Sequence, residues 1–220
     1  MCGRFTQNLS WHDIQKLYNL LNPPVNIEAR FNVAPTQKIY TVAARDDGRY
    51  LERMRWGLIP SWWNKAAKET PSTFNARAET VAEKPFFRAA FKRKRCIIPA
   101  SGFYEWKTSG KEKQPYYITS KDGSVLSFAG LWDEWKDVKS GESIKSCTII
   151  VTAANKTLRP LHDRMPVMLS EKSFSPWLSG EAGLELLKPA PESWLKFWPV
   201  SKRVNSTREN DDATLIERLQ

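Results

Sequence analysis

The chain has 220 residues, 41% of them hydrophobic, which is enough to bury one sizeable core and favours a single domain over residues 1–220. No apolar run reaches the length of a membrane span and the N-terminal stretch does not resemble a signal peptide, so we expect a cytoplasmic protein, nucleoid-associated if bacterial, with no membrane partner. A formal charge of +10 with ten Trp suggests single-stranded nucleic acid as the partner, because phosphates attract Lys and Arg while unstacked bases need flat rings; charge alone also fits a solvated basic surface.

The N-terminal sequence Met1-Cys2-Gly3-Arg4-Phe5 offers a specific chemistry. If Met1 is removed, Cys2 carries a thiol with a pKa of about 8.5 and an α-amine with a pKa of about 8. The amine can condense with an aldehyde to a Schiff base, and the thiol can then close on the same carbon to give a thiazolidine ring. The alternative is an incidental residue exposed by Met trimming.

The three cysteines, Cys2, Cys96 and Cys147, are odd in number and widely separated, which fits neither a disulfide framework nor a paired metal site. Cys96 and Cys147 lie in apolar runs, so we predict both in the core. The sequence has no glycine-rich phosphate loop and no zinc-ligand spacing. We therefore expect chemistry without a metal or a cofactor.

The first third predicts a helix and a hairpin. A capped, amphipathic pattern predicts a helix from Ser10 to Leu21, and residues 37–44 and 49–58 flank a turn at Asp46-Asp47-Gly48. Between them, Asn32 lies in an irregular segment that either presents it to a ligand in a loop or merely turns into the next strand.

Two segments of the middle third combine aromatic and cationic residues. Residues 56–63 (WGLIPSWW) predict a stiff loop whose large rings either wedge into a base stack or cap the core. Residues 84–95 predict a helix with Pro in its first turn, an apolar side, six cations and no acid. That charge pattern favours attraction of phosphates.

Glu105 follows an apolar run and lies between aromatic residues on a predicted strand. Desolvation in such surroundings raises the pKa of a carboxyl group, which suits proton transfer near neutral pH. The alternative is an outward-facing Glu on an alternating strand. Trp106 is then expected on the opposite face.

The remaining elements are predicted as a second hairpin formed by residues 114–119 and 124–132, and a buried strand over residues 146–153. His162 stands beside an acid and an Arg in LHDRMPV, where it is either structural or catalytic. Short helices are predicted at 173–178 and 182–187 and a strand at 194–200, followed by a loosely ordered tail from about residue 205.

Several runs occur in order from residue 2 to about residue 168: MCGRF, FNVAP, WGLIPSWW, FNARAET, RCIIPASGFYEW, FAGLW, VTAAN and LHDRMPV. Together they closely resemble the SRAP family, the SOS-response-associated peptidase fold of abasic-site processing proteins. The resemblance implies an α+β fold, with a single domain built on a twisted antiparallel β-barrel-like core and surrounding helices.

The resemblance also implies a function, which is to shield abasic sites in single-stranded DNA, including single-to-double-strand junctions, through a covalent thiazolidine. It makes Cys2 the crosslinking nucleophile, Asn75 the residue that holds the sugar, Glu105 the proton-transfer group, and His162 an aid to ring opening and the Schiff-base steps. The expected DNA-binding residues are Arg4, Asn32, Trp62, Trp63, Arg77, Trp106, Thr152 and Arg164.

Nothing in the sequence suggests an obligate oligomer, so we expect a monomer. Two other interpretations of its function remain open at this level. One is a non-covalent module for single-stranded nucleic acid. The other is a thiol peptidase with Cys2 as nucleophile and His162 as base, in line with the family's name. Schiff-base chemistry also predicts a lyase-like side reaction at the abasic site, and self-removal of Met1 fits the same nucleophile.

Overall fold

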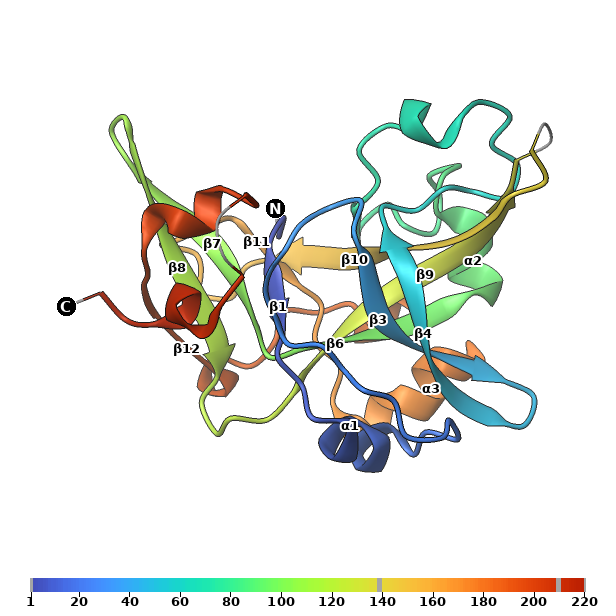
Figure 1. The fold of residues 1–220 in the computed structure, drawn as a ribbon, viewed down its shortest axis with the longest axis horizontal. Coiled ribbons are helices and arrows are strands. Elements are labelled where there is room, and N and C mark those ends of the chain that lie inside the picture. The colour runs from blue at the N-terminus through green and yellow to red at the C-terminus, as the bar shows by residue number, and fades with distance from the viewer. Residues whose placement is uncertain (1, 138–139, 209–210, 220) are drawn as a thin grey trace.

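The computed structural model describes residues 2–137, 140–208 and 211–219 (Figure 1). The strands are β1 (Phe5–Gln7), β2 (Arg30–Val33), β3 (Lys38–Arg45), β4 (Gly48–Trp56), β5 (Asn75–Arg77), β6 (Arg95–Ala100), β7 (Gly102–Ser109), β8 (Glu112–Ser120), β9 (Leu126–Lys136), β10 (Ser143–Ala153), β11 (Arg164–Pro166) and β12 (Leu195–Pro199). The α-helices are α1 (Trp11–Tyr18), α2 (Arg88–Arg93) and α3 (Phe174–Ser179), and the short 3-10 helices are η1 (Ala67–Glu69), η2 (Glu171–Ser173), η3 (Leu184–Leu186), η4 (Glu192–Trp194), η5 (Lys202–Asn205) and η6 (Ala213–Ile216).

Strands β3, β4, β6, β9 and β10 close into a barrel. β10 pairs with β4, β4 with β3, β3 with β6, β6 with β9, and β9 pairs back with β10. All of these pairs are antiparallel except that of β10 with β4. The predicted α+β fold with a largely antiparallel, barrel-like core is therefore confirmed.

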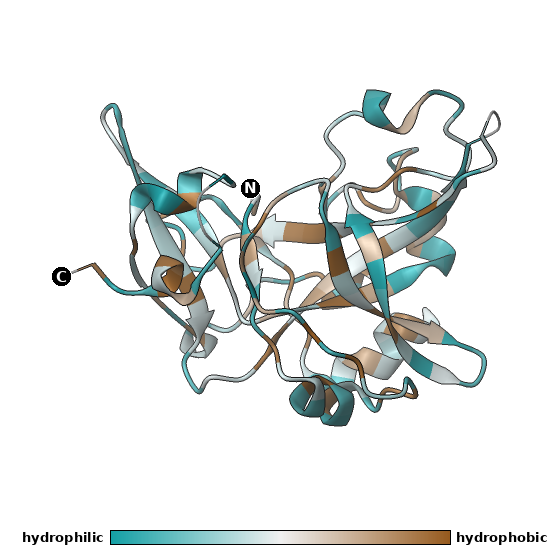
Figure 2. Cartoon of the chain, viewed as in Figure 1, coloured by the Kyte–Doolittle hydropathy of each residue, from teal (hydrophilic) through white to brown (hydrophobic). Residues whose placement is uncertain are grey.

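The apolar side chains of the barrel strands form two hydrophobic clusters, because successive side chains of a strand point to opposite faces. Ile98 and Ile149 belong to one cluster, whereas their neighbours Ile97 and Ile150 belong to a second cluster that includes Trp177 of α3. The outward faces of α1 and α2 and the hairpin tips are hydrophilic (Figure 2). The helices thus cover the outside of the barrel wall.

A second sheet, in the order β12-β8-β7-β1-β2, lies beside the barrel (Figure 1). Aromatic rings join the two, since Phe128 of β9 contacts both Phe5 of β1 and Phe103 of β7, with ring centroids 6.3 and 5.8 Å apart. The start of the chain therefore lies where the sheet meets the barrel.

The predicted hairpin through Asp46-Asp47-Gly48 is confirmed as β3 and β4, but the second predicted hairpin is wrong. β8 pairs with β7 and β12, whereas β9 pairs with β6 and β10 in the barrel. Residues 121–125 therefore connect the two sheets instead of forming a tight turn. Local turn chemistry indicates where a chain bends and cannot say which sheet the next strand joins.

Two predicted helices are shorter than expected. α1 ends at Tyr18, and Asn19 caps it in the left-handed conformation with φ of 51°. α2 begins only at Arg88, since residues 80–87 form turns.

The tail is packed where the structure describes it, which differs from the predicted loose order. Leu215 of η6 is fully buried, and the Trp198 Nε1–H donates to the carbonyl of Ile216 at 2.8 Å. Asp211 forms an ion pair with Arg30 at 2.8 Å. Residues 209–210 of the predicted tail lie outside the described residues. The segment is mostly polar, so its composition predicts loose order even though a few apolar side chains anchor it.

No helix among the described residues is both long and apolar enough to cross a membrane.

Substituting Gly102 with Ala is expected to lower the free energy of unfolding by about 1–3 kcal/mol. A Cβ at this position would overlap the ring of Tyr117, which is buried and bonded to Thr6. Urea denaturation of the two proteins measures the difference. Equal midpoints and slopes would contradict this packing.

Candidate active site at the start of the chain

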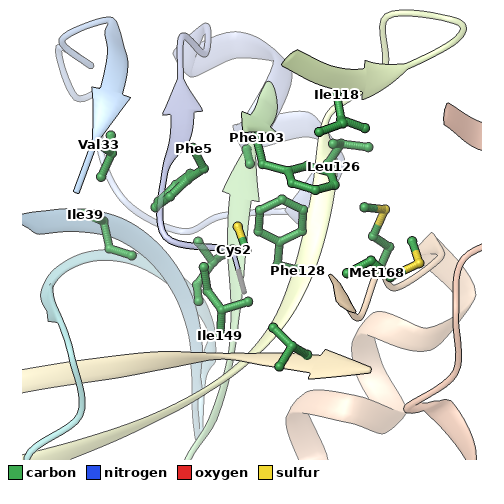
Figure 3. Packing of buried hydrophobic residues seen from close by; sticks show 14 of the residues in the cluster. Cys2, Phe5, Val33, Ile39, Phe103, Ile118, Leu126, Phe128, Ile149 and Met168 are labelled. Atoms are coloured by element: carbon green, nitrogen blue, oxygen red, sulfur yellow. The ribbon is translucent and has the colours of Figure 1, made fainter. Parts of the chain in front are cut away.

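Cys2 lies in the core between the barrel and the second sheet. Its side chain is fully buried close to Phe128 and Ile149 (Figure 3), and its Sγ–H donates to the carbonyl of Arg4 at 3.8 Å. Burial raises the pKa of the Cys2 thiol well above its usual value, and the negative charge of Glu105 raises it further. The thiol is therefore protonated at neutral pH. Met1, whose removal the predicted chemistry requires, lies outside the described residues.

Glu105 extends from β7 and shares this interior. It is opposite Tyr116 of β8, and only 3% of its surface is exposed. Burial raises the pKa of Glu105 to about 7, and the charge of Asp163 contributes to the rise. The predicted rise in pKa is confirmed, and the alternative of an outward-facing Glu is wrong. The carboxyl group can both accept and donate a proton near neutral pH.

His162 follows β10 in the turn that leads to β11. Its Nδ1 lies 3.0 Å from the backbone N of Arg164 and 2.8 Å from Asp163 Oδ1, and the two contacts require different protonation of that nitrogen. Burial lowers the pKa of His162 more than Asp163 raises it, which favours the neutral ring with Nδ1 accepting from Arg164. The charge of Asp163 also contributes to the raised pKa of Glu105, so it acts on both groups.

Asn75 begins β5 and is opposite Ile149 of β10, which lies beside Cys2 (Figure 3). Its Nδ2 donates to the carbonyl of Phe74 at 3.1 Å, whereas its Oδ1 is buried and has no hydrogen-bond partner among the described residues. A buried acceptor without a donor costs about 1–3 kcal/mol. Such an atom is typical of a site where a ligand supplies the missing donor.

Two of the predicted DNA-binding arginines lie on either side of β10. Arg77 of β5 is exposed and opposite Val151, and Arg164 of β11 is opposite Ala153. Glu79 forms an ion pair with Arg164 at 2.5 Å. Thr152, between them on β10, is only 5% exposed, so its side chain is not on the open surface. Arg77 is therefore an exposed cation two residues from Asn75 on β5, whereas the charge of Arg164 is paired with Glu79.

The tryptophans of residues 56–63 divide between core and surface. Trp56 is fully buried and donates to the carbonyl of Phe74 at 2.8 Å. Trp62 is 51% exposed, and its ring packs edge-on against Trp63 and Phe86, with centroids 6.2 and 5.3 Å away. Trp56 therefore caps the core as one alternative predicted, whereas the exposed Trp62 leaves contact with bases a prediction.

The predicted basic helix is only partly a basic surface. Lys84, Arg88, Lys92 and Arg93 are exposed. Lys94 pairs with Asp133 at 2.7 Å. Arg95 is buried and donates to backbone carbonyls, including that of Phe91 at 2.8 Å. Two of the six cations therefore stabilise the fold.

Arg4, Asn32 and Trp106 all form hydrogen bonds with the C-terminal segment, at residues 204–206. Asn32 belongs to β2 and is only 4% exposed, so the predicted loop that presents it to a ligand is wrong. Its Oδ1 accepts from the Arg4 guanidinium at 2.7 Å. The Trp106 Nε1–H donates to Asn205 Oδ1 at 2.8 Å.

Sequence reasoning missed Asp163, Glu79 and Asn205 as members of the site. Asp163 directly precedes Arg164 and Glu79 follows Arg77 by two residues, so acidic side chains close to arginines were an available signal. Nothing in the local sequence marks Asn205, because its partner Trp106 is 99 residues away.

A family model, named relatives and a solved structure all match this chain. The family model described as SOS response associated peptidase (SRAP) matches residues 1–207. The abasic site processing protein YoqW of Bacillus subtilis is 39% identical over 99% of both chains, and the abasic site processing protein YedK of Escherichia coli is 31% identical over 99% of both. A crystal structure of a protein from Bacteroides thetaiotaomicron covers 100% of both chains with a TM-score of 0.90 and 26% identity. The chain belongs to the SOS response associated peptidase (SRAP) family.

Proposed function

We propose that this protein processes abasic sites in single-stranded DNA, including those at single-to-double-strand junctions, and that it does so as a cytoplasmic monomer. The observation that carries the proposal is the burial of Cys2 together with Glu105, whose pKa of about 7 suits proton transfer. The names of YoqW and YedK, abasic site processing proteins, support the choice of substrate.

The proposed reaction begins once Met1 is removed and the α-amine of Cys2 is free. Glu105, ionised, accepts a proton from the ammonium group so that the neutral amine can attack. The abasic sugar exists mainly as a closed hemiacetal, and His162 moves the proton that opens it to the aldehyde. The amide of Asn75 binds the sugar hydroxyl groups through its buried Oδ1, which lacks a donor among the described residues.

The amine and the aldehyde then form a carbinolamine, which loses one water to give the imine. The Cys2 thiol adds across the C=N bond, forming the C–S bond while its proton ends on the ring nitrogen. The net reaction consumes the aldehyde and releases one water. The amine attacks first and the thiol closes the ring second, because the thiol adds to the C=N bond that the amine forms.

The imine also allows β-elimination at the sugar, so strand cleavage is an expected minor reaction. Ring closure suppresses it by consuming the imine. A thiol peptidase acting on other proteins would need a thiolate nucleophile, and the raised pKa of the Cys2 thiol does not favour one.

The test is a uracil-containing single strand treated with uracil-DNA glycosylase and incubated with the processed protein. We expect a band that resists denaturation with the abasic strand and none with the untreated strand. Salt-sensitive binding of both strands without such a band would instead favour the non-covalent module. Intact-mass analysis of the same protein checks that Met1 is absent, and its retention in crosslinking material would contradict the mechanism.

A further inference from the structure

Three residues that the resemblance assigns to DNA binding are all held by consecutive residues near the C-terminus. The Arg4 guanidinium donates to the carbonyl of Val204 at 3.0 Å and to that of Asn205 at 3.4 Å. Asn32 Nδ2 donates to the carbonyl of Ser206 at 2.9 Å. With the bond from Trp106 to Asn205, residues 204–206 contact all three side chains.

The segment that makes these contacts is fixed at both ends. Val200 and Val204 are fully buried against Tyr104 and Tyr117, and Leu215 is fully buried further along. Asp211 accepts from the backbone N–H of Phe31 at 2.6 Å and pairs with Arg30 beside it. These buried side chains and contacts hold residues 204–206 against this face of the protein.

We propose that residues 204–206 form part of the DNA-binding site and that Asn205 is a positioning residue for Trp106. The bond from its amide oxygen fixes the plane of the Trp106 indole, a half-buried ring whose exposed part faces incoming bases. The carbonyls of residues 204 and 205 aim the guanidinium of Arg4. This inference rests on the proposed function and names a part of the site that acts before any covalent step.

The hydrogen bonds leave Arg4 able to bind a phosphate. A guanidinium has five N–H donors, and the bonds to Asn32, Val204 and Asn205 use three of them. Burial lowers the pKa of Arg4 only from a very high value, so the group stays charged. Because the Arg4 guanidinium and the Trp106 indole are already oriented, less conformational entropy is lost when a strand binds.

The test uses non-covalent binding to a single strand that carries one tetrahydrofuran residue, an abasic analogue without an aldehyde. Dissociation constants are measured by fluorescence anisotropy for wild type, Asn205→Ala, Trp106→Phe and the double variant. Trp106→Phe removes the N–H donor and keeps an aromatic ring. Asn8→Ala, at an exposed asparagine beyond the far end of β1, is the matched control.

We expect Asn205→Ala to weaken binding roughly fivefold, as the loss of one fixed hydrogen bond would. The double variant should bind no more weakly than Trp106→Phe alone, because both changes remove the same bond. The control should bind as wild type does, and thermal midpoints should agree within about 3 °C, since residue 205 is exposed.

Wild-type affinity in Asn205→Ala, or additive effects in the double variant, would overturn the positioning role. Tighter binding by Asn205→Ala would overturn it as well and would indicate that the segment competes with the strand. The analogue cannot crosslink, so failure of the covalent reaction leaves this measurement intact. Absence of any binding by wild type would contradict both proposals.

Discussion

Replacing Cys2 with Ser is expected to abolish the denaturation-resistant adduct with an abasic strand. The variant keeps the α-amine, so it can still form the imine, but a hydroxyl is a much weaker nucleophile than a thiol and does not close the ring. Borohydride should therefore trap Cys2→Ser on the strand, whereas without reductant the variant should show more strand cleavage than wild type. Denaturing gel electrophoresis separates the adduct, the cleaved strand and the intact strand.

Cys96→Ala provides the matched control, because Cys96 is also a fully buried thiol in the same hydrophobic cluster. We expect it to crosslink as wild type does. A stable adduct formed by Cys2→Ser without reductant would rule out the thiazolidine. Loss of the adduct in both variants would point to damage of the core and not to a nucleophilic role.

Replacing Glu105 with Gln is expected to slow adduct formation about a hundredfold or more, the usual contribution of a general acid–base group. In wild type the rate should rise between pH 6 and pH 8, because the pKa of Glu105 is raised to about 7 and the ionised form accepts the ammonium proton. The variant should lose that rise. Single-turnover rates across this range measure both effects, and an unchanged pH profile in the variant would assign the titration to another group.

The same substitution is expected to stabilise the protein at alkaline pH. A carboxyl whose pKa is raised by folding binds its proton more tightly in the folded state, so the wild type loses stability as pH rises from the unfolded value near 4.5 through 7. The stability gained by Glu105→Gln should therefore be about 2 to 3 kcal/mol larger at pH 8.5 than at pH 5. Urea denaturation at the two pH values measures this, and an equal gain at both would show that the carboxyl is not desolvated in the folded state.

The effects of Glu105→Gln on the rate of adduct formation and on stability have a common cause. Burial without full compensation makes Glu105 costly to ionise, and the same cost brings its pKa to the range where proton transfer is useful. Activity and stability are therefore expected to change in opposite directions at this one residue.

Much of the local structure was predictable because it depends on neighbours in sequence. The β3–β4 turn follows from Asp46-Asp47-Gly48. The aromatic residues beside Glu105 indicated a buried carboxyl group, whereas the rise in its pKa comes from the burial that the tertiary structure produces. The connection between β8 and β9 has similar turn residues and was predicted wrongly, because the strands it joins belong to different sheets.

The candidate site likewise contains features that the local sequence predicted and features that it did not. Cys2, Glu105 and His162 lie in short runs whose residue types suggest chemistry, whereas Asn75 followed only from the resemblance to the SRAP family. The structure brings Cys2 and Glu105 into one interior. The surroundings of Arg4, which lies 200 residues from Val204, carried no local signal. Polar residues of the tail predicted loose order, whereas a few buried side chains hold it in place.

The sequence by itself determined the family and most strands of the barrel wall, and it suggested the residues proposed for aldehyde chemistry, since each depends on residue identity and short-range order. Only the tertiary structure decided that the barrel closes through β9 and β10, that the Cys2 thiol is buried and protonated, and that residues 204–206 hold Arg4, Asn32 and Trp106. These features depend on contacts between distant segments and on the desolvation they produce, and neither is encoded in any one stretch of the chain.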